Sequence, residues 1–486
     1  MRYRSLGAFI EAAANVDDVK VISGADRDAD VGCLTELGAE RSGPLLVFDR
    51  FAGFDPDFRV ASNVINNIRR YALLYAIPRE THPVEIVRIQ RERTRSLRLI
   101  PPVEVEDGPV LTHTMLGEEV DVEHFPAPRW HSGDGGRYIG TGDVVIMRDP
   151  ESGHVNYGTY RVSVQGRDRV SIWIIGHKAG RIIAEKYWKR GQTCPVAIVL
   201  GCDPLTFSAA TSGRTGRKYD YAGALHGAPV EVLRAPQTGL PVPAEAEIVL
   251  EGELPPPHEE SAFEGPFGEW PGYYSHSGQE CVVRIRRISH RPAPIIYGAP
   301  PLRPLLSWDQ DVPQYSGRMW EHLESSGISD VVGVWGHCAS LMTVIAIRQR
   351  YAGHAKQALL AATGLRTGAS MYSTYVVVDD DVDPSNMREV LWAICTRVDP
   401  ARALDVIPNA WTSDLDPRLT PDQKASGDFR VGRTLIDACR PYVWRDTFPA
   451  SNVFSPAEKQ EVTARWRSLV DELEHWQHRA ALQPTR

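Results

Sequence analysis

The stretch "GDVVIMRDPESGHVNYGTYRVSVQGRDRVSIWII", residues 142–175, decides the fold class of this chain. Its apolar runs "GDVVIMRD" and "RVSIWII" are short, and Gly, Pro or charged residues separate them. Runs of the same kind continue to about residue 300: "PVAIVLG", "PVEVLRA", "AEIVLEG" and "CVVRIRRI". Many short strands at this spacing favour a β-barrel or β-sandwich over repeated βαβ units. We therefore predict a β-rich middle, from about residue 116 to 300.

Both flanks of this middle have an α/β pattern. Before it come a helix (Leu6–Ala14), the β-type runs "VKVIS" and "PLLVF", and a helical stretch over residues 63–77. The Pro-rich "LIPPVEVEDGPV" is typical of a linker. After it we predict the strands "MTVIAIRQ" and "STYVVVDDDVD", the helices "GHAKQALLAATG" and "NMREVLWAICTRV", and an amphipathic helix over about 456–479. The sequence thus predicts three parts, 1–115, 116–304 and 305–486, in a mixed α/β (α+β) protein.

Composition excludes several classes of partner. The net charge of -8 and the pI near 6.0 give no basic surface for nucleic acid or an anionic membrane. Seven cysteines without CxxC spacing favour reduced thiols in the cytoplasm over disulfides or a zinc knuckle. No apolar run approaches the roughly 18 residues of a membrane span, and "MRYRSLGAFIEAAANVDDV" has the pattern of an amphipathic helix, not of a signal peptide. We expect a cytoplasmic protein with no nucleic-acid and no membrane partner.

Several segments carry candidate binding residues. The Gly-rich "HSGDGGRYIGTG" (131–142) fits either a phosphate cradle or a tight loop. The segments "NYGTYR" and "HKAG" offer Asn156 and His177 as possible metal ligands, and "RKYDYAGALHG" offers Asp220 as a third. Taken singly, His177 also fits a structural histidine. Arg161 lies in a β-type run, where its guanidinium could bind a carboxylate in bidentate fashion.

The segment "EGPFGEWPGYY" (264–274) carries Glu264 and Glu269 on a loop rich in Gly, Pro and aromatic residues. A solvated turn explains such a pair. Acid–base chemistry is the alternative, because two neighbouring carboxylates cannot both ionise cheaply and one then keeps its proton near neutral pH. An arginine beside them would keep the other ionised. The spacing alone leaves both interpretations open. Dinucleotide and P-loop motifs are absent from the sequence.

Taken together, these segments resemble the UbiD family of decarboxylases, which use prenylated FMN. The resemblance rests on eight segments in family order: "NVINNIRRYALLYAIP", "NYGTYR", "HKAG", "DYAGALHGAPVEV", "PAEAEIVLEGE", "EGPFGEWPGYY", "YAGHAKQALLAA" and "VVVDDDVDPSNMREVLWAICTRVDP". It implies an N-terminal α/β domain, a central flavin-reductase-like split β-barrel and a C-terminal α/β domain that mediates dimerisation. A homodimer is expected, with hexamers in some members.

The resemblance also implies a cofactor site. The family holds prenylated FMN, supplied by a flavin prenyltransferase, through its phosphate with a divalent metal, usually Mn2+, and K+ alongside. By motif, Asn156 and His177 correspond to metal ligands. The residues that correspond to the cofactor lining are Gly158, Thr159, Tyr160, Arg161, Trp173, Ile174, Ile175, Lys178 and Ala179.

Two positions depart from the family pattern. The third metal ligand is a glutamate in the family, and its place falls on Lys218 or on Asp220, depending on the side from which one aligns. We expect both on one face of a strand and assign Asp220 as the ligand. A lysine that usually meets the cofactor phosphate corresponds to Thr374 here. Lys218 is therefore expected to supply this positive charge to the cofactor, with a weakened or altered metal site.

The catalytic network that the resemblance implies is Arg161, Glu264 and Glu269. In it Arg161 orients the substrate carboxylate, Glu264 pairs with Arg161, and Glu269 protonates the carbon that loses CO2. Gly176 and Trp270 fall beside the expected substrate pocket. The substrate is expected to be an unsaturated carboxylic acid: an aromatic, a heteroaromatic or a conjugated alkenoic acid. An inactive flavin-binding or scaffold protein and a plain FMN oxidoreductase remain alternatives.

Overall fold

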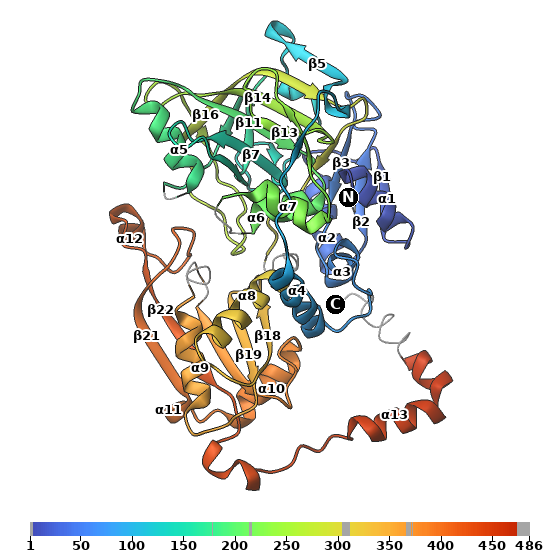
Figure 1. Cartoon of the computed structure of the whole chain (residues 1–486), viewed down its shortest axis with the longest axis vertical. Coiled ribbons are helices and arrows are strands. Elements are labelled where there is room, and N and C mark those ends of the chain that lie inside the picture. The colour runs from blue at the N-terminus through green and yellow to red at the C-terminus, as the bar shows by residue number, and fades with distance from the viewer. Residues whose placement is uncertain are drawn as a thin grey trace.

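The computed structural model describes residues 3–176, 178–212, 216–303, 312–365, 371 and 373–473. Figure 1 shows two lobes, one built from the N-terminal and middle segments and one from the C-terminal segment. Both lobes contain sheets with helices packed on them, so the predicted mixed α/β class is confirmed.

The N-terminal segment forms a four-stranded sheet in the order β1-β2-β3-β17. Its last strand comes from the far end of the middle segment, and it pairs in parallel with β3. The strands are β1 (Val19–Ser23), β2 (Leu45–Asp49), β3 (Arg59–Ser62) and β17 (Ile295–Tyr297), and the helices are α1 (Leu6–Ala14), α2 (Val31–Glu40), α3 (Ile68–Leu74) and α4 (Pro83–Ser96).

The helix expected over residues 63–77 is shorter than predicted. Asn67 adopts an extended backbone and its side chain accepts a hydrogen bond from the backbone N–H of Arg70, so it caps the helix. Asn63 has a positive φ of 53°, which a helix does not allow. The helix α3 therefore begins at Ile68.

The middle segment forms a ten-stranded sheet in the order β6-β9-β10-β16-β14-β11-β7-β8, with β5 and β15 also paired to β16. The two ends of this order, β6 and β8, do not pair with each other in the described residues, so no closed barrel forms there. The predicted split β-barrel stays a prediction. The strands are β5 (His113–Leu116), β6 (Tyr138–Gly140), β7 (Asp143–Arg148), β8 (Val155–Gly158), β9 (Val162–Gly166), β10 (Arg169–Ile172), β11 (Cys194–Leu200), β14 (Ile248–Leu254), β15 (Ser261–Glu264) and β16 (Gly278–His290).

Shorter elements flank this sheet. Three helices follow or precede its strands: α5 (Ala179–Trp188), α6 (Pro204–Thr211) and α7 (Lys218–His226). A small separate sheet pairs β4 (Val103–Glu104), β12 (Glu231–Arg234) and β13 (Pro241–Pro243). The 3-10 turns are η1 (Pro109–Leu111), η2 (Gly117–Glu119), η3 (Val122–His124) and, near the C-terminus, η5 (Tyr442–Thr447).

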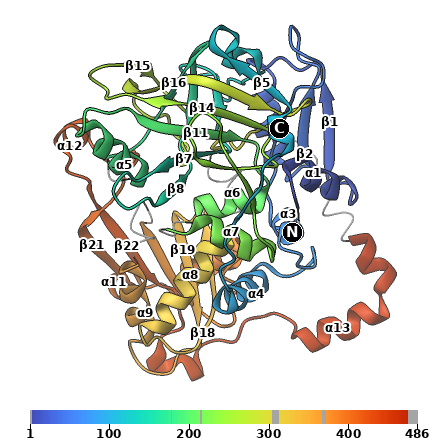
Figure 2. The ribbon, with the colours of Figure 1, turned by 45° about the horizontal axis from the view of Figure 1, so that its top comes forward.

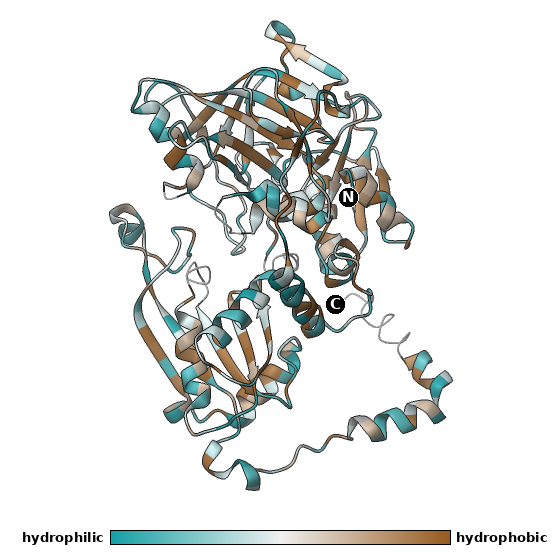
Figure 3. Cartoon of the chain, viewed as in Figure 1, coloured by the Kyte–Doolittle hydropathy of each residue, from teal (hydrophilic) through white to brown (hydrophobic). Residues whose placement is uncertain are grey.

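The central strands of the large sheet are buried on both faces. On β7, Val144 and Ile146 pack into one hydrophobic core, and Val145 and Met147 pack into another. Alternate side chains of a strand point to opposite faces, so two cores require a continuous apolar run. Each fully buried Val, Ile or Met contributes about 1.5–3 kcal/mol to stability. Figure 3 shows these strands in brown, between the more polar surface segments.

The C-terminal lobe holds a five-stranded sheet in the order β18-β19-β20-β22-β21. Figures 1 and 2 show α4, from the N-terminal segment, beside α8 of this lobe. Arg91 of α4 forms an ion pair with Glu324 of α8 at 2.7 Å and lies over the ring of Trp320. The elements are α8 (Val312–Ser325), β18 (Val331–His337), β19 (Met342–Ile347), α9 (His354–Thr363), β20 (Thr374–Asp379), α10 (Met387–Arg397), α11 (Pro400–Ala403), β21 (Leu404–Trp411), α12 (Pro421–Ser426) and β22 (Arg430–Asp437).

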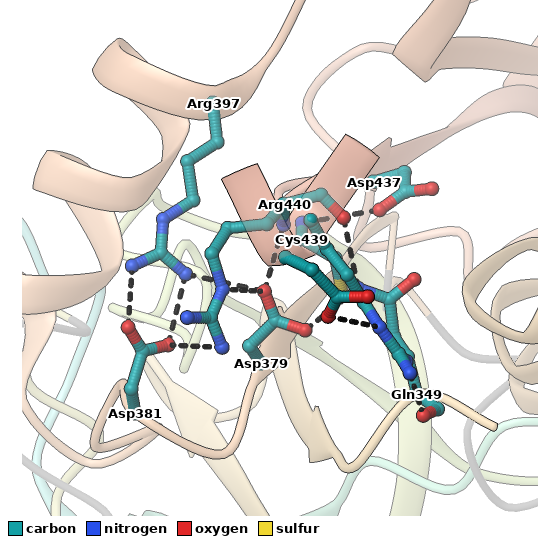
Figure 4. A network of polar contacts seen from close by, with 9 residues as sticks. Gln349, Asp379, Asp381, Arg397, Asp437, Cys439 and Arg440 are labelled. Carbon is teal, nitrogen blue, oxygen red and sulfur yellow. Dashed lines mark hydrogen bonds and ion pairs between the residues drawn. The ribbon is translucent and has the colours of Figure 1, made fainter. Parts of the chain in front are cut away.

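A buried polar network joins the C-terminal end of β20, the central strand of this sheet, to α10 (Figure 4). Asp379, at the end of β20 and 3% exposed, accepts hydrogen bonds from Gln349 at 2.7 Å and from the backbone N–H of Arg440 at 2.7 Å. The Arg397 guanidinium lies 3.4 Å from Asp379 and forms a bidentate pair with Asp381 at 2.9 and 2.8 Å. One carboxylate therefore fixes three segments of the lobe.

The chain then leaves the lobe as an extended arm that carries α13 (Pro456–Arg465). In Figures 1 and 2 this arm stands clear of both lobes. The helix predicted over about 456–479 is confirmed for its first part, and residues 474–486 lie outside the described residues. Across the described ranges, every helix is too short or too polar to cross a membrane.

Candidate active site

Arg161, Glu264 and Glu269 meet in the interior of the structure. Arg161 lies between β8 and β9, Glu264 ends β15, and Glu269 lies on the loop that follows. Arg161 Nε and Nη2 donate to the two carboxylate oxygens of Glu264 at 2.9 and 2.6 Å, and Nη1 donates to Glu269 Oε1 at 2.5 Å. The three side chains are 6%, 2% and 10% exposed. The alternative of a solvated turn is therefore wrong.

The loop that carries Glu269 is held in a tight hairpin. The backbone N–H of Glu269 donates to the carbonyl of Tyr273, and Ser275 donates to the carbonyl of Phe267. The Gly-rich segment 131–142 packs against this hairpin. Its backbone N–H groups of Gly133 and Gly135 donate to the Tyr274 hydroxyl at 3.0 Å and to the carbonyl of Pro266 at 2.8 Å. Because these two N–H groups already donate to oxygens of the protein, they are not available to a phosphate. The segment therefore fits the alternative of a tight loop better than that of a phosphate cradle.

The two glutamates have different surroundings. Glu264 accepts a third hydrogen bond, from the Tyr138 hydroxyl at 2.6 Å. Burial raises the pKa of Glu269, and Arg161 opposes that rise only in part. Burial would lower the pKa of Arg161, but its pairing with Glu264 raises it overall. Arg161 therefore stays charged, and burial favours the protonated form of Glu269.

Two aromatic rings fix the plane of the Arg161 guanidinium. Its central carbon lies 4.5 Å from the ring centroid of Trp173 and 5.2 Å from that of Phe267. Phe267 also packs against Tyr138, with ring centroids 4.2 Å apart. Neither Phe267 nor Tyr138 was expected from the sequence to be functional. Both lie within quoted motifs, but no spacing rule connects residues so far apart along the chain.

Arg161 and Glu269 line a cavity of about 250 Å3, which we call the first cavity. Trp270, predicted for the substrate pocket, also lines it, whereas Gly176 does not. Leu415, which reaches the cavity from the C-terminal lobe, is a part of the wall that the sequence analysis did not find. The other residues around the first cavity are Thr141, Asp143, Thr159, Tyr160, Trp173, Ile175, Lys178, Phe267, Ala299 and Pro301.

A second cavity of about 600 Å3 adjoins the first, and the two share Thr159, Tyr160 and Lys178 in their walls. Of the remaining predicted cofactor residues, Ile174 instead packs into the hydrophobic core. The predicted residues that line only the second cavity are Asn156, Gly158, Ala179 and Lys218.

The second cavity is positively charged. Lys218 donates to the carbonyl of Ala210 at 2.6 Å, and burial together with the nearby charge of Lys178 lowers the pKa of Lys218 to about 8. Loss of hydration also lowers the pKa of Lys178. The helix α5, which begins at Ala179, directs its N-terminus to the same cavity. Two close ammonium groups and a helix N-terminus attract an anion such as a phosphate.

Of the predicted metal ligands, the structure describes Asn156 and Asp220, and these two do not line the same cavity. Asn156 lines the second cavity, is 7% exposed, and its Nδ2 lacks a hydrogen-bond partner. His177 lies outside the described residues. Asp220 accepts two hydrogen bonds from Arg217, at 2.9 and 2.6 Å, and is not part of the cavity wall. In the described part of the chain, no three His, Cys, Asp or Glu side chains form a cluster that could hold a metal ion.

The expectation that Lys218 and Asp220 share a face of a strand was wrong. Both belong to the helix α7, in which residues two apart point to nearly opposite sides. Lys218 therefore faces the second cavity while Asp220 turns to Arg217. Thr374, where the family pattern has a lysine, begins β20 in the C-terminal lobe.

Comparison with known proteins identifies the family. The family model described as the 3-octaprenyl-4-hydroxybenzoate carboxy-lyase Rift-related domain matches residues 102–304, and that of the carboxy-lyase C-terminal domain matches residues 316–438. A phenolic acid decarboxylase of Streptomyces sp. (strain D7) is 32% identical over 440 residues, covering 88% of this chain and 89% of the relative. A pyrrole-2-carboxylic acid decarboxylase of Pseudomonas aeruginosa is 29% identical over 479 residues, covering 93% and 95%.

Solved structures agree with this assignment. The vanillic acid decarboxylase of Sedimentibacter hydroxybenzoicus in its open form superposes with a TM-score of 0.84 at 25% identity, covering 98% of this chain and 100% of the other. The UbiD-class enzyme HmfF of Pelotomaculum thermopropionicum, solved in complex with FMN, gives a TM-score of 0.81 at 25% identity, covering 93% and 98%. The chain therefore belongs to the UbiD family of decarboxylases.

Proposed function

We propose that this chain is a prenylated-FMN-dependent, non-oxidative and reversible decarboxylase of an α,β-unsaturated carboxylic acid. The observation that carries the proposal is the buried Glu264–Arg161–Glu269 set at the wall of the first cavity. Relatives named for phenolic acids and for pyrrole-2-carboxylic acid support an aromatic or heteroaromatic substrate. A conjugated alkenoic acid is the third class of substrate that we propose to test.

The two joined cavities fit the cofactor. Lys178, Lys218 and the N-terminus of α5 would hold its phosphate in the second cavity, and the ring system would extend into the first cavity past Thr159 and Tyr160. The bound flavin supplies the electron sink that decarboxylation requires. HmfF, solved with FMN and in an evolved form with prenylated FMN, supports this choice of cofactor. We also propose that the ten-stranded sheet is the flavin-reductase-like split β-barrel of the family.

The side chains around the second cavity fit the proposed Mn2+ and K+ less well than they fit the phosphate of the cofactor. Asn156 and His177 remain the proposed ligands for Mn2+, with K+ alongside, but Asp220 is engaged by Arg217 and the Lys218 ammonium occupies the cavity wall. We therefore derive no step through a metal ion. Metal analysis of the loaded protein tests this point, because one tightly held Mn2+ per subunit bound through Asp220 would show that the site is intact.

The chain's own residues perform the acid–base part of the reaction. Arg161 orients the substrate carboxylate, and its bidentate pair with Glu264 keeps the guanidinium in one position. As the carbon–carboxyl bond breaks and CO2 leaves, Glu269 transfers its proton to the carbon that carried the carboxyl group. The raised pKa of Glu269 favours this role, because a proton donor must start protonated. Trp270 and Phe267 exclude water from the reacting carbon.

The Glu269→Gln variant tests the proposal. We expect it to lose turnover on a panel of unsaturated acids, measured as CO2 release or as H/D exchange at the α-carbon, while it still binds FMN. In the wild-type enzyme, turnover should fall as the pH rises through the raised pKa of Glu269, since the donor is then deprotonated.

Glu247→Gln is the matched control for this experiment. Burial raises the pKa of Glu247 to about 7, but its side chain does not line the first cavity and its charged neighbours are not those of the catalytic set, so turnover should persist. Unimpaired turnover in Glu269→Gln would remove Glu269 from the mechanism.

An inactive flavin-binding protein of the same fold is the second candidate, favoured by Lys218 in the cavity wall. Co-expression with a flavin prenyltransferase, the proposed cofactor supplier, separates the two. A decarboxylase would gain flavin absorbance and release CO2, whereas a binding protein would gain absorbance alone. A plain FMN oxidoreductase would instead cycle with NAD(P)H, a chemistry in which the buried Glu264–Arg161–Glu269 set has no evident use.

A further inference from the structure

Asp143 is a buried acid in the wall of the first cavity without a partner. It begins β7, where it pairs in register with Leu200 of β11, and the residue is 1% exposed. Neither carboxyl oxygen has a hydrogen-bond partner. The backbone N–H groups of Asp143 and Tyr160 come near the carboxyl group but do not meet hydrogen-bond geometry. The reaction proposed above gives this side chain no role.

A carboxyl group in this position costs the fold stability. An unpaired polar group in the interior lowers the stability of the fold, and an ionised one lowers it more. Burial accordingly raises the pKa of Asp143 well above its usual range, which favours the neutral acid. Although Arg161 and Lys178 line the same cavity, neither forms an ion pair with Asp143 in the described structure. A valine, as at the next two positions of β7, would avoid the cost.

The first cavity offers the missing partner. In its wall Arg161 and Glu269 bind each other, the Thr141 hydroxyl accepts from the backbone of Ala299, and the Lys178 ammonium is also present. A molecule in this cavity would therefore meet the two cations and the carboxyl group of Asp143. The Arg161 and Lys178 cations suit a carboxylate, and the Asp143 carboxyl group suits an N–H or O–H donor.

We propose that Asp143 binds an N–H or O–H group on the ring that occupies the first cavity. This inference rests on the proposed function and deepens it. Two rings carry such a donor: a substrate acid of the pyrrole or phenol type, and the flavin, through its imide N–H. On the substrate, the donor and the carboxylate would be recognised at two points. An analogue without the donor would leave Asp143 unpaired and would bind more weakly.

Binding measurements test the proposal without turnover. The fluorescence of Trp173 and Trp270, which line the cavity, reports the binding of acids to the FMN-loaded protein. One ligand pair is pyrrole-2-carboxylate and furan-2-carboxylate, which differ in the ring N–H, and the other is 4-hydroxybenzoate and benzoate. Quenching of flavin fluorescence reports the affinity for FMN in a separate titration.

The variants are Asp143→Leu and Asp143→Asn, with Glu247→Gln as the control. Glu247 is also buried, and burial raises its pKa to about 7, but it lies away from the first cavity. If the donor is on the substrate, wild type should prefer the donor-bearing member of one pair by about tenfold, and Asp143→Leu should abolish that preference. If it is on the flavin, Asp143→Leu should weaken FMN binding by about tenfold and leave the acids unaffected.

Either result supports the proposal, and Asp143→Asn, which keeps a hydrogen-bonding side chain, should retain part of the effect. It also serves in place of Asp143→Leu if that variant does not fold. The proposal is overturned if a folded variant shows wild-type FMN affinity and wild type itself binds both members of each pair equally. None of these readouts requires CO2 release, so their failure is separate from a failure of the decarboxylase proposal.

Discussion

Glu264 and Glu269 differ by the number of donors that reach them. Glu264 accepts from two nitrogens of Arg161 and from the Tyr138 hydroxyl, whereas one nitrogen of Arg161 reaches Glu269. A single arginine between two glutamates therefore holds them unequally. Glu264 is fixed by three donors, whereas Arg161 reaches Glu269 with one nitrogen and burial raises the pKa of Glu269, as a proton donor requires.

Lys218 gives a prediction at the residue scale. Replacing it with Met removes one of the two ammonium groups at the second cavity, so the affinity for FMN should fall by about tenfold, as for loss of a charge-assisted hydrogen bond. The measurement is a flavin fluorescence titration of FMN against the variant. Riboflavin, which lacks the phosphate, is the control, and its affinity should not change. An equal loss for both flavins would place Lys218 away from the phosphate.

Some residues of the candidate site could be predicted from the sequence and others could not. Arg161, Glu264 and Glu269 could be named because they lie in motifs of the family, and the structure brings them together. Tyr138 and Asp143 could not, since their roles depend on contacts between strands distant in the sequence. These contacts are set by tertiary packing, which local patterns do not record.

At the scale of elements, strands were predicted better than helices in the middle segment. The apolar runs of β7, β11 and β14 stand out because both faces of these strands are buried. The helix α7 is short and buried around most of its surface, so its sequence lacks the polar face that marks an amphipathic helix. The strand β17 crosses to the N-terminal sheet, and no local signal predicts such a pairing.

The polar network around Asp379 gives a prediction for these elements. Asp379→Asn leaves the charges of Arg397 and Arg440 without their shared buried partner, so the free energy of unfolding should fall by about 3 kcal/mol. Urea denaturation followed by circular dichroism measures it. Asp380→Asn is the matched control, because the ion pair of Asp380 among the described residues is with the exposed Arg348, and its loss should change stability by less than about 0.5 kcal/mol. Equal midpoints for the two variants would contradict the role of the network.

At the scale of the whole molecule, the C-terminal arm presents an apolar stripe to solvent. Val462, Trp466, Leu469 and Leu473 are 46%, 59%, 46% and 55% exposed, at spacings of four, three and four residues. Val462 lies on α13, Trp466 is its C-cap, and Leu469 and Leu473 lie on the helical segment that follows, at spacings typical of helices that pack along a partner. The edge strand β21 also exposes Leu404, at 41%, and Val406, at 69%. We propose that a second copy of the chain covers these surfaces, in the homodimer that the family resemblance predicts, with a hexamer as a further possibility.

Removing the arm tests this assembly. A chain that ends after Ala450 lacks the stripe and should sediment as a monomer. Leu469→Lys puts a charge into the stripe and should weaken the dimer. Analytical ultracentrifugation measures the oligomeric state. Gln460→Lys, on the exposed side of α13, is the control and should remain dimeric. A dimer that survives removal of the arm would assign the contact to other surfaces.

The wall of the first cavity comes from both lobes, since Leu415 lies opposite residues of the large sheet. A change in the angle between the lobes would therefore change the volume available to a substrate, even with the same side chains around it. The contact between α4 and α8, where Arg91 pairs with Glu324, joins the two lobes, and neither of these residues lines the first cavity. We therefore expect substitutions at this contact to change the substrate range without alteration of any residue that touches the acid.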